Sequence, residues 1–437
     1  MQRPTVRATI IFSVLVLTIL GLVAFSFPYT PLEDLPEWIY QGYVFNELAS
    51  GTPSPDFALK NYPVPYALFQ TIVSACLLFA SPMATSRIVV FLYAGLSLYA
   101  INRVIARYRL DPFVAWPLLI STVVLNSPFW NGYMGYQFGL TVILLYLALP
   151  ERFQVDAKWI CLFSVLGFFA HGWAFISILV LIGCSALFKR RVFAACLGVA
   201  PSIALLAWYQ IRNVNPGVLS EFLHVEHVNI FAYKIYTVLK AAPFHNPIVF
   251  GFNASERYGI VFLGAGLIVD AIFLIALAVL AVFAIRKSGS IAILRRPQLL
   301  AGVLLLLLAA GLPPTGFGMA NPGERVMYPA TIALLIAIFA DVELAVVPKA
   351  ILGCALAAGV GLFALGLVGA STAYRAEAAS FDPKASPPPV ISRDLLFGHR
   401  LVQFDEKMRL LQQAWRDDVM PTMPLAFETA LIAPTRK

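Results

Sequence analysis

Long apolar runs separated by short polar segments make up most of this chain of 437 residues. Many of the runs are roughly 16–28 residues long, and about 20 apolar residues are enough for a helix to cross a hydrocarbon core of about 30 Å. A helix also satisfies its own backbone hydrogen bonds in lipid. The pattern therefore predicts an all-α protein that crosses a membrane several times.

One apolar run, Val64–Ala80, decides how the later runs are oriented. As a full span it would place every later basic cluster on the side opposite to Arg3 and Arg7, so we predict that it lies along the outer surface as a juxtamembrane hairpin. Lys158–Phe188 would be about 46 Å long as one helix, which favours two short spans that meet at His171. About 11 spans result: Ala8–Phe27, Ser86–Ile105, Phe113–Leu125, Gly139–Leu149, the two halves of Lys158–Phe188, Val192–Tyr209, Tyr258–Ile285, Gln298–Leu312, Val326–Ala340 and Ala350–Ala370.

The distribution of Lys and Arg sets the predicted orientation of these spans. The segments assigned to the cytoplasm hold 15 Lys and Arg and 5 Asp and Glu, whereas the outer loops before the tail hold 7 and 9. Basic residues in short loops favour the cytoplasmic side. We therefore expect a multi-pass membrane protein with a cytoplasmic N-terminus and an extracytoplasmic C-terminus.

Two loops and a tail stand out from the predicted transmembrane domain, residues 1–370. The first outer loop, residues 28–85, contains the juxtamembrane segment, and a second large outer loop spans residues 210–257. The tail, residues 371–437, begins with a proline-rich linker and continues with an amphipathic stretch whose apolar positions follow the 3.6-residue period of a helix. We expect the tail to form a short extracytoplasmic segment.

Composition excludes several classes of protein. Apolar residues make up 60% of the chain and charged residues 12%, and the mean hydropathy is +0.80, unlike a soluble globule. The net charge of +8 is spread over short clusters between apolar runs, so we predict no nucleic-acid partner. All five cysteines lie in apolar runs. His224 and His227 are spaced for one helical face but have no third ligand nearby, which argues against a zinc site. The second outer loop has no Asp-x-Asp motif, so we predict no bound metal and no cofactor, with a divalent metal as the open alternative.

Carboxylates are concentrated directly after the first apolar run. The segment Pro28–Tyr62 holds five of them, in a chain with 23 in total. A carboxylate at the outer membrane surface can act as a general base, although acidic residues are also typical of a solvated helix start. The five are Glu33, Asp34, Glu37, Glu47 and Asp56.

Two motifs in this loop give the chain a resemblance to a known group of enzymes. Leu-Glu-Asp-Leu-Pro at 32–36 and Asn-Tyr-Pro-Val-Pro-Tyr at 61–66 follow a first span and precede several short spans. This arrangement resembles the GT-C superfamily of membrane glycosyltransferases, which share a first-loop carboxylate and juxtamembrane helices. Many bacterial members have Asp-Leu-Pro-Asn-His in this loop, whereas Glu37 and Trp38 follow the proline here.

The resemblance implies a function and a set of site residues. Such enzymes move a sugar from a polyprenyl-phosphate donor to a glycan or lipid acceptor of the cell envelope, on the outer face of the bilayer. The resemblance places Asp34, with Glu33 in reserve, as the general base. Further candidates come from the other predicted outer loops. Arg325, Arg257 and His171 are positioned to bind the donor phosphate, Glu324 stands beside Arg325 as its possible ion-pair partner, and Trp38, Tyr133 and Tyr136 are candidates to stack on sugar rings.

Several alternatives stay open on the sequence alone. The aromatic residues of the second outer loop, Trp130, Tyr133 and Tyr136, are also typical of an interfacial aromatic belt. Asp270 lies in the middle of a predicted span, where an ionisable residue invites a functional explanation. A transporter or flippase of a lipid-linked saccharide is therefore a second hypothesis. A non-catalytic membrane assembly protein with the same fold is a third.

Overall fold

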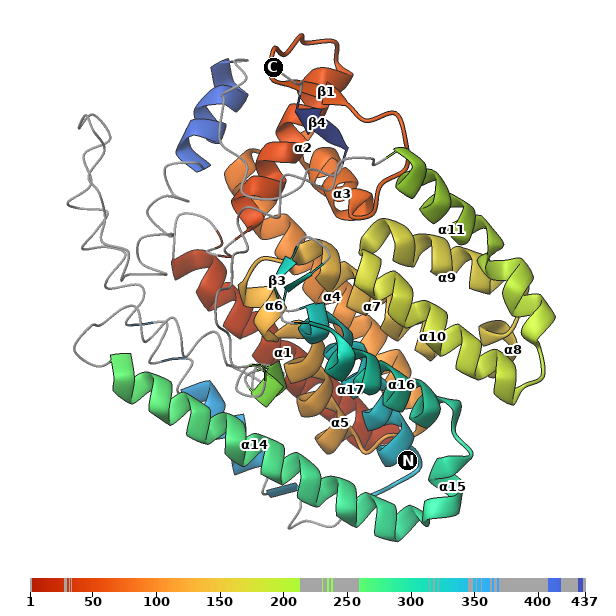
Figure 1. Ribbon diagram of the computed structural model, residues 1–437. Helices are drawn as coiled ribbons and strands as arrows, with labels where there is room; N and C mark the ends of the chain where they lie inside the picture. The colour runs from red at the N-terminus through yellow and green to blue at the C-terminus, as the bar shows by residue number, and fades with distance from the viewer. Residues whose placement is uncertain are drawn as a thin grey trace.

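The fold is a bundle of α-helices with a few very short strands (Figure 1). It was obtained as a computed structural model. The described residues are 2–26, 30, 32, 34–212, 230, 234–235, 237–238, 259–313, 315–316, 319–320, 322–344, 349–350, 352–354, 356–361, 364, 368, 408–417 and 431–434.

Five of the described helices are long and apolar enough to cross a membrane. Each contains a stretch of at least 18 residues with high mean hydropathy and few charges. This confirms the prediction of an all-α protein with several membrane spans. The five are α1 (Gln2–Ser26), α4 (Pro82–Tyr108), α11 (Val192–Arg212), α14 (Gly259–Ser288) and α17 (Pro322–Phe339).

Shorter apolar helices fill the space between the long ones. The predicted break at His171 is confirmed, because α9 ends at the preceding residue and α10 begins at the following one. Pro117 lies inside α5, which continues directly into a five-residue π-helix, η1. These helices are α5 (Pro112–Leu119), η1 (Ile120–Val124), α6 (Ser127–Trp130), α7 (Met134–Ala148), α8 (Glu151–Gln154), α9 (Ala157–Ala170), α10 (Gly172–Phe188), α15 (Ser290–Leu294) and α16 (Pro297–Gly311).

The first loop forms a compact helix pair of its own. Helix α2 (Leu35–Ala49) packs against α3 (Ala67–Leu77), and a Cβ at Gly42 would lie 2.7 Å from the Val73 side chain, so only glycine permits this approach. The Gln70 amide donates to the Gln41 carbonyl over 3.1 Å. With 11 residues, α3 is only about 16 Å long, too short for a membrane span. The prediction for Val64–Ala80 agrees with this length.

The end of α3 exposes apolar side chains to the surroundings. Leu78 and Phe79 are 78% and 74% exposed, respectively. Exposed apolar residues beside a short amphipathic helix are typical of an element that lies in the membrane interface. The first loop therefore has the features expected of a juxtamembrane hairpin.

The C-terminal tail folds back onto the first loop. Strand β4 (Ile432–Pro434) pairs antiparallel with β1 (Phe57–Leu59), and the Leu431 N–H donates to the Gln70 side chain over 2.6 Å. The Tyr43 hydroxyl donates to the Ala414 carbonyl in the tail helix, residues 408–417. Figure 1 shows the first loop and the C-terminus at one end of the bundle and the N-terminus toward the other.

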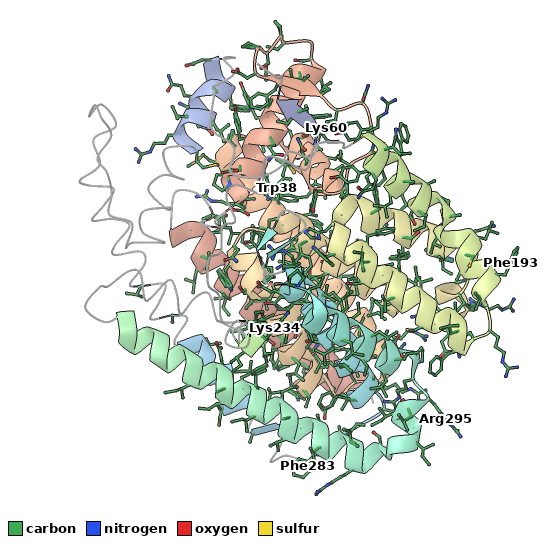
Figure 2. All side chains as sticks on the ribbon, in the orientation of Figure 1. Trp38, Lys60, Phe193, Lys234, Phe283 and Arg295 are labelled. Carbon is green, nitrogen blue, oxygen red and sulfur yellow. The ribbon has the colours of Figure 1, made fainter. Side chains whose placement is uncertain are left out.

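The predicted cytoplasmic loops meet at the opposite end. The buried Asp111 accepts from Lys349 over 2.6 Å, and the Tyr108 carbonyl accepts from the Asp341 N–H. Glu151 pairs with Lys189 in the same group of loops. Figure 2 shows Arg295 at this end and Trp38 and Lys60 at the other. The first loop and this group of loops therefore lie at opposite ends of the bundle.

Parts of the predicted organisation lie outside the described residues. These parts include most of residues 210–257, the end of the run Ala350–Ala370 and the linker at the start of the tail.

A short hairpin lies between the predicted spans Gln298–Leu312 and Val326–Ala340. It consists of β2 (Thr315–Gly316) and β3 (Met319–Ala320), and it precedes α17.

The pairing of β1 with β4 predicts a specific cross-link. The Lys60 N–H donates to the Leu431 carbonyl, so Leu59 and Ile432 form the next, non-hydrogen-bonded pair, whose Cα atoms are about 4.5 Å apart. A Leu59→Cys/Ile432→Cys variant should therefore form a disulfide under mild oxidation. Mobility on a non-reducing gel measures this. Ala58→Cys/Ile432→Cys is the control, because its side chains point to opposite faces. Equal cross-linking in both variants would contradict the register.

Candidate active site

The second outer loop, predicted over residues 126–138, supports the candidate site. Its start is fixed by the π-helix, where the Val123 carbonyl accepts from the Tyr93 hydroxyl over 2.5 Å. The side chain of Asn126 accepts from the Phe129 N–H over 2.9 Å and so caps α6. Gln137 contacts both Tyr93 and Asn126 within the core. These buried polar groups hold the loop in one conformation.

Asp34 lies directly against this loop. Its backbone N–H donates to the Asn131 carbonyl over 3.1 Å. Gly132 has φ +75°, and a Cβ there would lie 2.6 Å from the Asp34 nitrogen, so only glycine fits. Asp34 is the N-cap residue of α2, but its side chain makes no capping hydrogen bond to that helix. The partly exposed carboxylate is thus anchored through its backbone.

Arg325 approaches the same loop from α17. Its guanidinium carbon lies 4.5 Å from the centre of the Tyr133 ring, and its carbonyl accepts from the Tyr136 hydroxyl over 2.7 Å. Glu324, the neighbouring residue in the first turn of α17, is also buried. A buried cation of this kind is stabilised by a nearby carboxylate and an aromatic face.

His171 joins the first loop to the second through ring contacts. It lies in the turn between α9 and α10, and its ring centre is 4.8 Å from that of Tyr66 and 5.1 Å from that of Tyr136. Burial lowers the pKa of His171 well below its usual value, and the positive charge of Arg325 lowers it further. Because Nδ1 accepts from the Trp173 N–H, the neutral ring carries its proton on Nε2.

Tyr66 is a site residue that the sequence did not reveal. It has φ 73° and ψ −8°, a left-handed conformation that is rare for an aromatic residue, at the N-cap of α3. Its partly exposed ring also lies 6.5 Å from that of Trp38. Strained residues of this kind gather at functional sites. The only sequence signal is its place at the end of the proline-aromatic motif.

The cluster divides into buried and accessible members. Five members of the cluster are buried, and they set the shape and the electrostatic potential of the site. These are Trp38, Tyr136, His171, Glu324 and Arg325. Asp34, Tyr66 and Tyr133 are partly exposed and can be reached by a substrate.

The aromatic-belt alternative fails for two residues of the second loop. Trp130 and Tyr136 are each only 1% exposed and bond to backbone carbonyls, so they contact protein rather than a membrane interface. Two other candidates, Glu33 and Arg257, lie outside the described residues.

Chemically, the cluster combines an anion-binding group with a carboxylate. Arginine binds phosphate oxygens in a planar, bidentate manner. Across the described ranges, no three His, Cys, Asp or Glu residues gather at distances suited to a metal ion.

The tight contact at Gly132 can be tested by substitution. Gly132→Ala should lower the free energy of unfolding by about 1–3 kcal/mol, because the new Cβ collides with the Asp34 backbone and φ +75° disfavours alanine. Thermal unfolding of the protein in detergent measures this. Gly172→Ala is the control, since no atom lies within 4 Å of its Cβ position. Equal melting temperatures for the two variants would contradict the close approach.

Comparisons with known proteins add no further evidence. No protein-family model, curated protein or solved structure matches this chain.

Proposed function

We propose that this protein is a membrane glycosyltransferase of GT-C type. It takes a hexose or pentose from a polyprenyl-phosphate donor and transfers the sugar to a glycan or lipid of the cell envelope. One observation supports this most directly. The Asn131–Tyr133 turn contacts the Asp34 backbone on one side and the Arg325 guanidinium on the other. A base and an anion-binding group therefore lie on either side of one short turn.

The proposed reaction uses these two groups in one step. An acceptor hydroxyl attacks the anomeric carbon of the donor, and its proton passes to the Asp34 carboxylate. The bond between the anomeric carbon and the phosphate oxygen breaks, and the lipid phosphate leaves with its negative charge. Arg325 stabilises that charge. General-base catalysis of this type contributes about 10²–10⁴-fold to the rate.

The surroundings of the cluster suit a donor that is carried in lipid. Tyr66 of the site stands at the start of α3, and the exposed apolar residues Leu78 and Phe79 follow the end of the same helix. A polyprenyl chain in the bilayer can reach this level while its sugar contacts Tyr66 and Tyr133. The proposal places the first loop on the outer face of the bacterial inner membrane, which makes the N-terminus cytoplasmic and the C-terminus extracytoplasmic.

A transporter or flippase is the main alternative, and one observation favours it. Asp270 is buried within the 30-residue helix α14, away from both of its ends. A transporter needs an ionisable group at such a depth, whereas the glycosyltransferase does not use Asp270. An assembly protein without activity is the third possibility. Transfer of label to an acceptor separates the enzyme from both alternatives.

The role of Asp34 can be tested directly. We expect Asp34→Asn to lower the rate of sugar transfer by about 10²–10⁴-fold, because the amide cannot accept the proton of the acceptor. The assay uses protein purified in detergent, polyprenyl-phosphate donors with labelled hexoses or pentoses, and a membrane lipid extract as acceptor. Asp56→Asn is the matched control, because Asp56 lies beside β1 in the same loop. Full transfer by Asp34→Asn would remove this residue from the mechanism.

The role of Arg325 predicts a different kinetic change. Arg325→Lys keeps the charge but loses the planar group that stacks on Tyr133, which shifts the charge relative to the donor phosphate. We expect the KM for the donor to rise by roughly tenfold, with a smaller change in kcat. Arg87→Lys is the control, because Arg87 stacks on Phe25 at 4.8 Å, outside the cluster. Equal KM values for both variants would argue against phosphate binding at Arg325.

A further inference from the structure

The tail helix, residues 408–417, has two different faces. Met408, Leu411 and Ala414 are buried against the protein, as the amphipathic pattern predicts. On the other side, Arg409, Gln412, Gln413 and Arg416 follow the i, i+3, i+4, i+7 spacing of one helical stripe. The apolar face explains how the helix docks, and Arg409, Gln413 and Arg416 of the polar stripe are exposed.

The polar stripe lines a groove beside the start of α4. The groove has a volume of about 440 Å³, and Met83 in the first turn of α4 forms its apolar wall. Arg409 and Arg416 supply two positive charges, and Asp417 adds one carboxylate. The side-chain oxygen of Gln412, Oε1, is buried and has no hydrogen-bond partner among the described residues. The groove therefore offers both cationic donors and acceptors.

The groove lies at the level of a membrane surface. Helix α4 has 27 residues and is about 40 Å long, which exceeds the hydrocarbon core of about 30 Å. Its first turn, with Met83, therefore reaches the headgroup region. In the tail helix, Leu410 and Trp415 are 42% and 41% exposed, and tryptophan is enriched at membrane interfaces. A ligand of this groove is thus most readily supplied by the membrane.

We propose that this groove binds the headgroup of a phospholipid that carries both a phosphate and an amine, as phosphatidylethanolamine does. The two arginines bind the phosphate. The Asp417 carboxylate accepts hydrogen bonds from the ammonium group. A headgroup with phosphate alone would leave this acceptor unused, and a trimethylated amine has no N–H to donate. The site is separate from the proposed sugar-transfer site and does not depend on that reaction.

Lipid binding can be measured on the full chain in detergent by native mass spectrometry. The probes are dioctanoyl phosphatidylethanolamine and dioctanoyl phosphatidylcholine, which differ only in the N–H donors of the headgroup. We expect the ethanolamine lipid to bind about tenfold more tightly. Arg409→Gln/Arg416→Gln should weaken its binding by roughly 30-fold, about a factor of five for each charge. Arg191→Gln/Arg286→Gln, a pair of exposed arginines outside the groove, is the control with the same charge change.

A second variant keeps the test decisive if the double substitution unfolds the tail. Asp417→Asn should lower the affinity for the ethanolamine lipid to that for the choline lipid, because the ammonium loses its charged acceptor. Soluble glycerophosphoethanolamine in equal concentration should not displace the lipid, since it lacks the acyl chains that Leu410 and Trp415 contact. Equal binding of the two lipids, or unchanged binding by both variants, would overturn the proposal. Displacement by the soluble headgroup would overturn the assignment to a membrane lipid.

Discussion

The backbone contact between Asp34 and the Asn131–Gly132 turn joins the two halves of the candidate site. One half belongs to the first loop, and the other belongs to the turn between α6 and α7. Backbone atoms make this contact, so the position of Asp34 depends on a glycine with positive φ and on the polar groups that fix the turn. The buried residues Tyr93, Asn126 and Gln137 therefore stabilise a site that they do not touch.

Residues far apart in the sequence meet through rings and charges around this contact. Tyr136 contacts His171 through its ring and Arg325 through its hydroxyl, so it connects three helices. The buried ends of α10 and α17 are thereby held against α7. Because most members are buried, the cluster presents a small accessible surface formed by Asp34, Tyr66 and Tyr133. A rigid, charged interior beneath a small accessible surface is what preorganised electrostatics require.

The sequence predicted the features that depend on length and periodicity. The break at His171 followed from a run too long for one span, and the short α3 followed from the separation of basic and acidic loops. The left-handed Tyr66, the π-helix after Pro117 and the pairing of β1 with β4 were not predictable in this way. Each of these depends on tertiary contacts between distant segments. The grouping of Arg325 with Tyr133 likewise has no signal in local sequence, although both residues were candidates.

The strand pair formed by β1 and β4 has a consequence for biosynthesis. Leu431 bonds to Gln70, a residue 361 positions earlier in the chain, and the tail helix bonds to α2 over a similar separation. The first loop emerges early during synthesis, but its β1 edge and the surface of α2 stay uncovered until the last spans have been inserted. A chain that stops early or inserts its last span incorrectly therefore leaves the β1 edge unpaired. An unpaired strand edge is a feature by which quality-control proteases can recognise incomplete assembly.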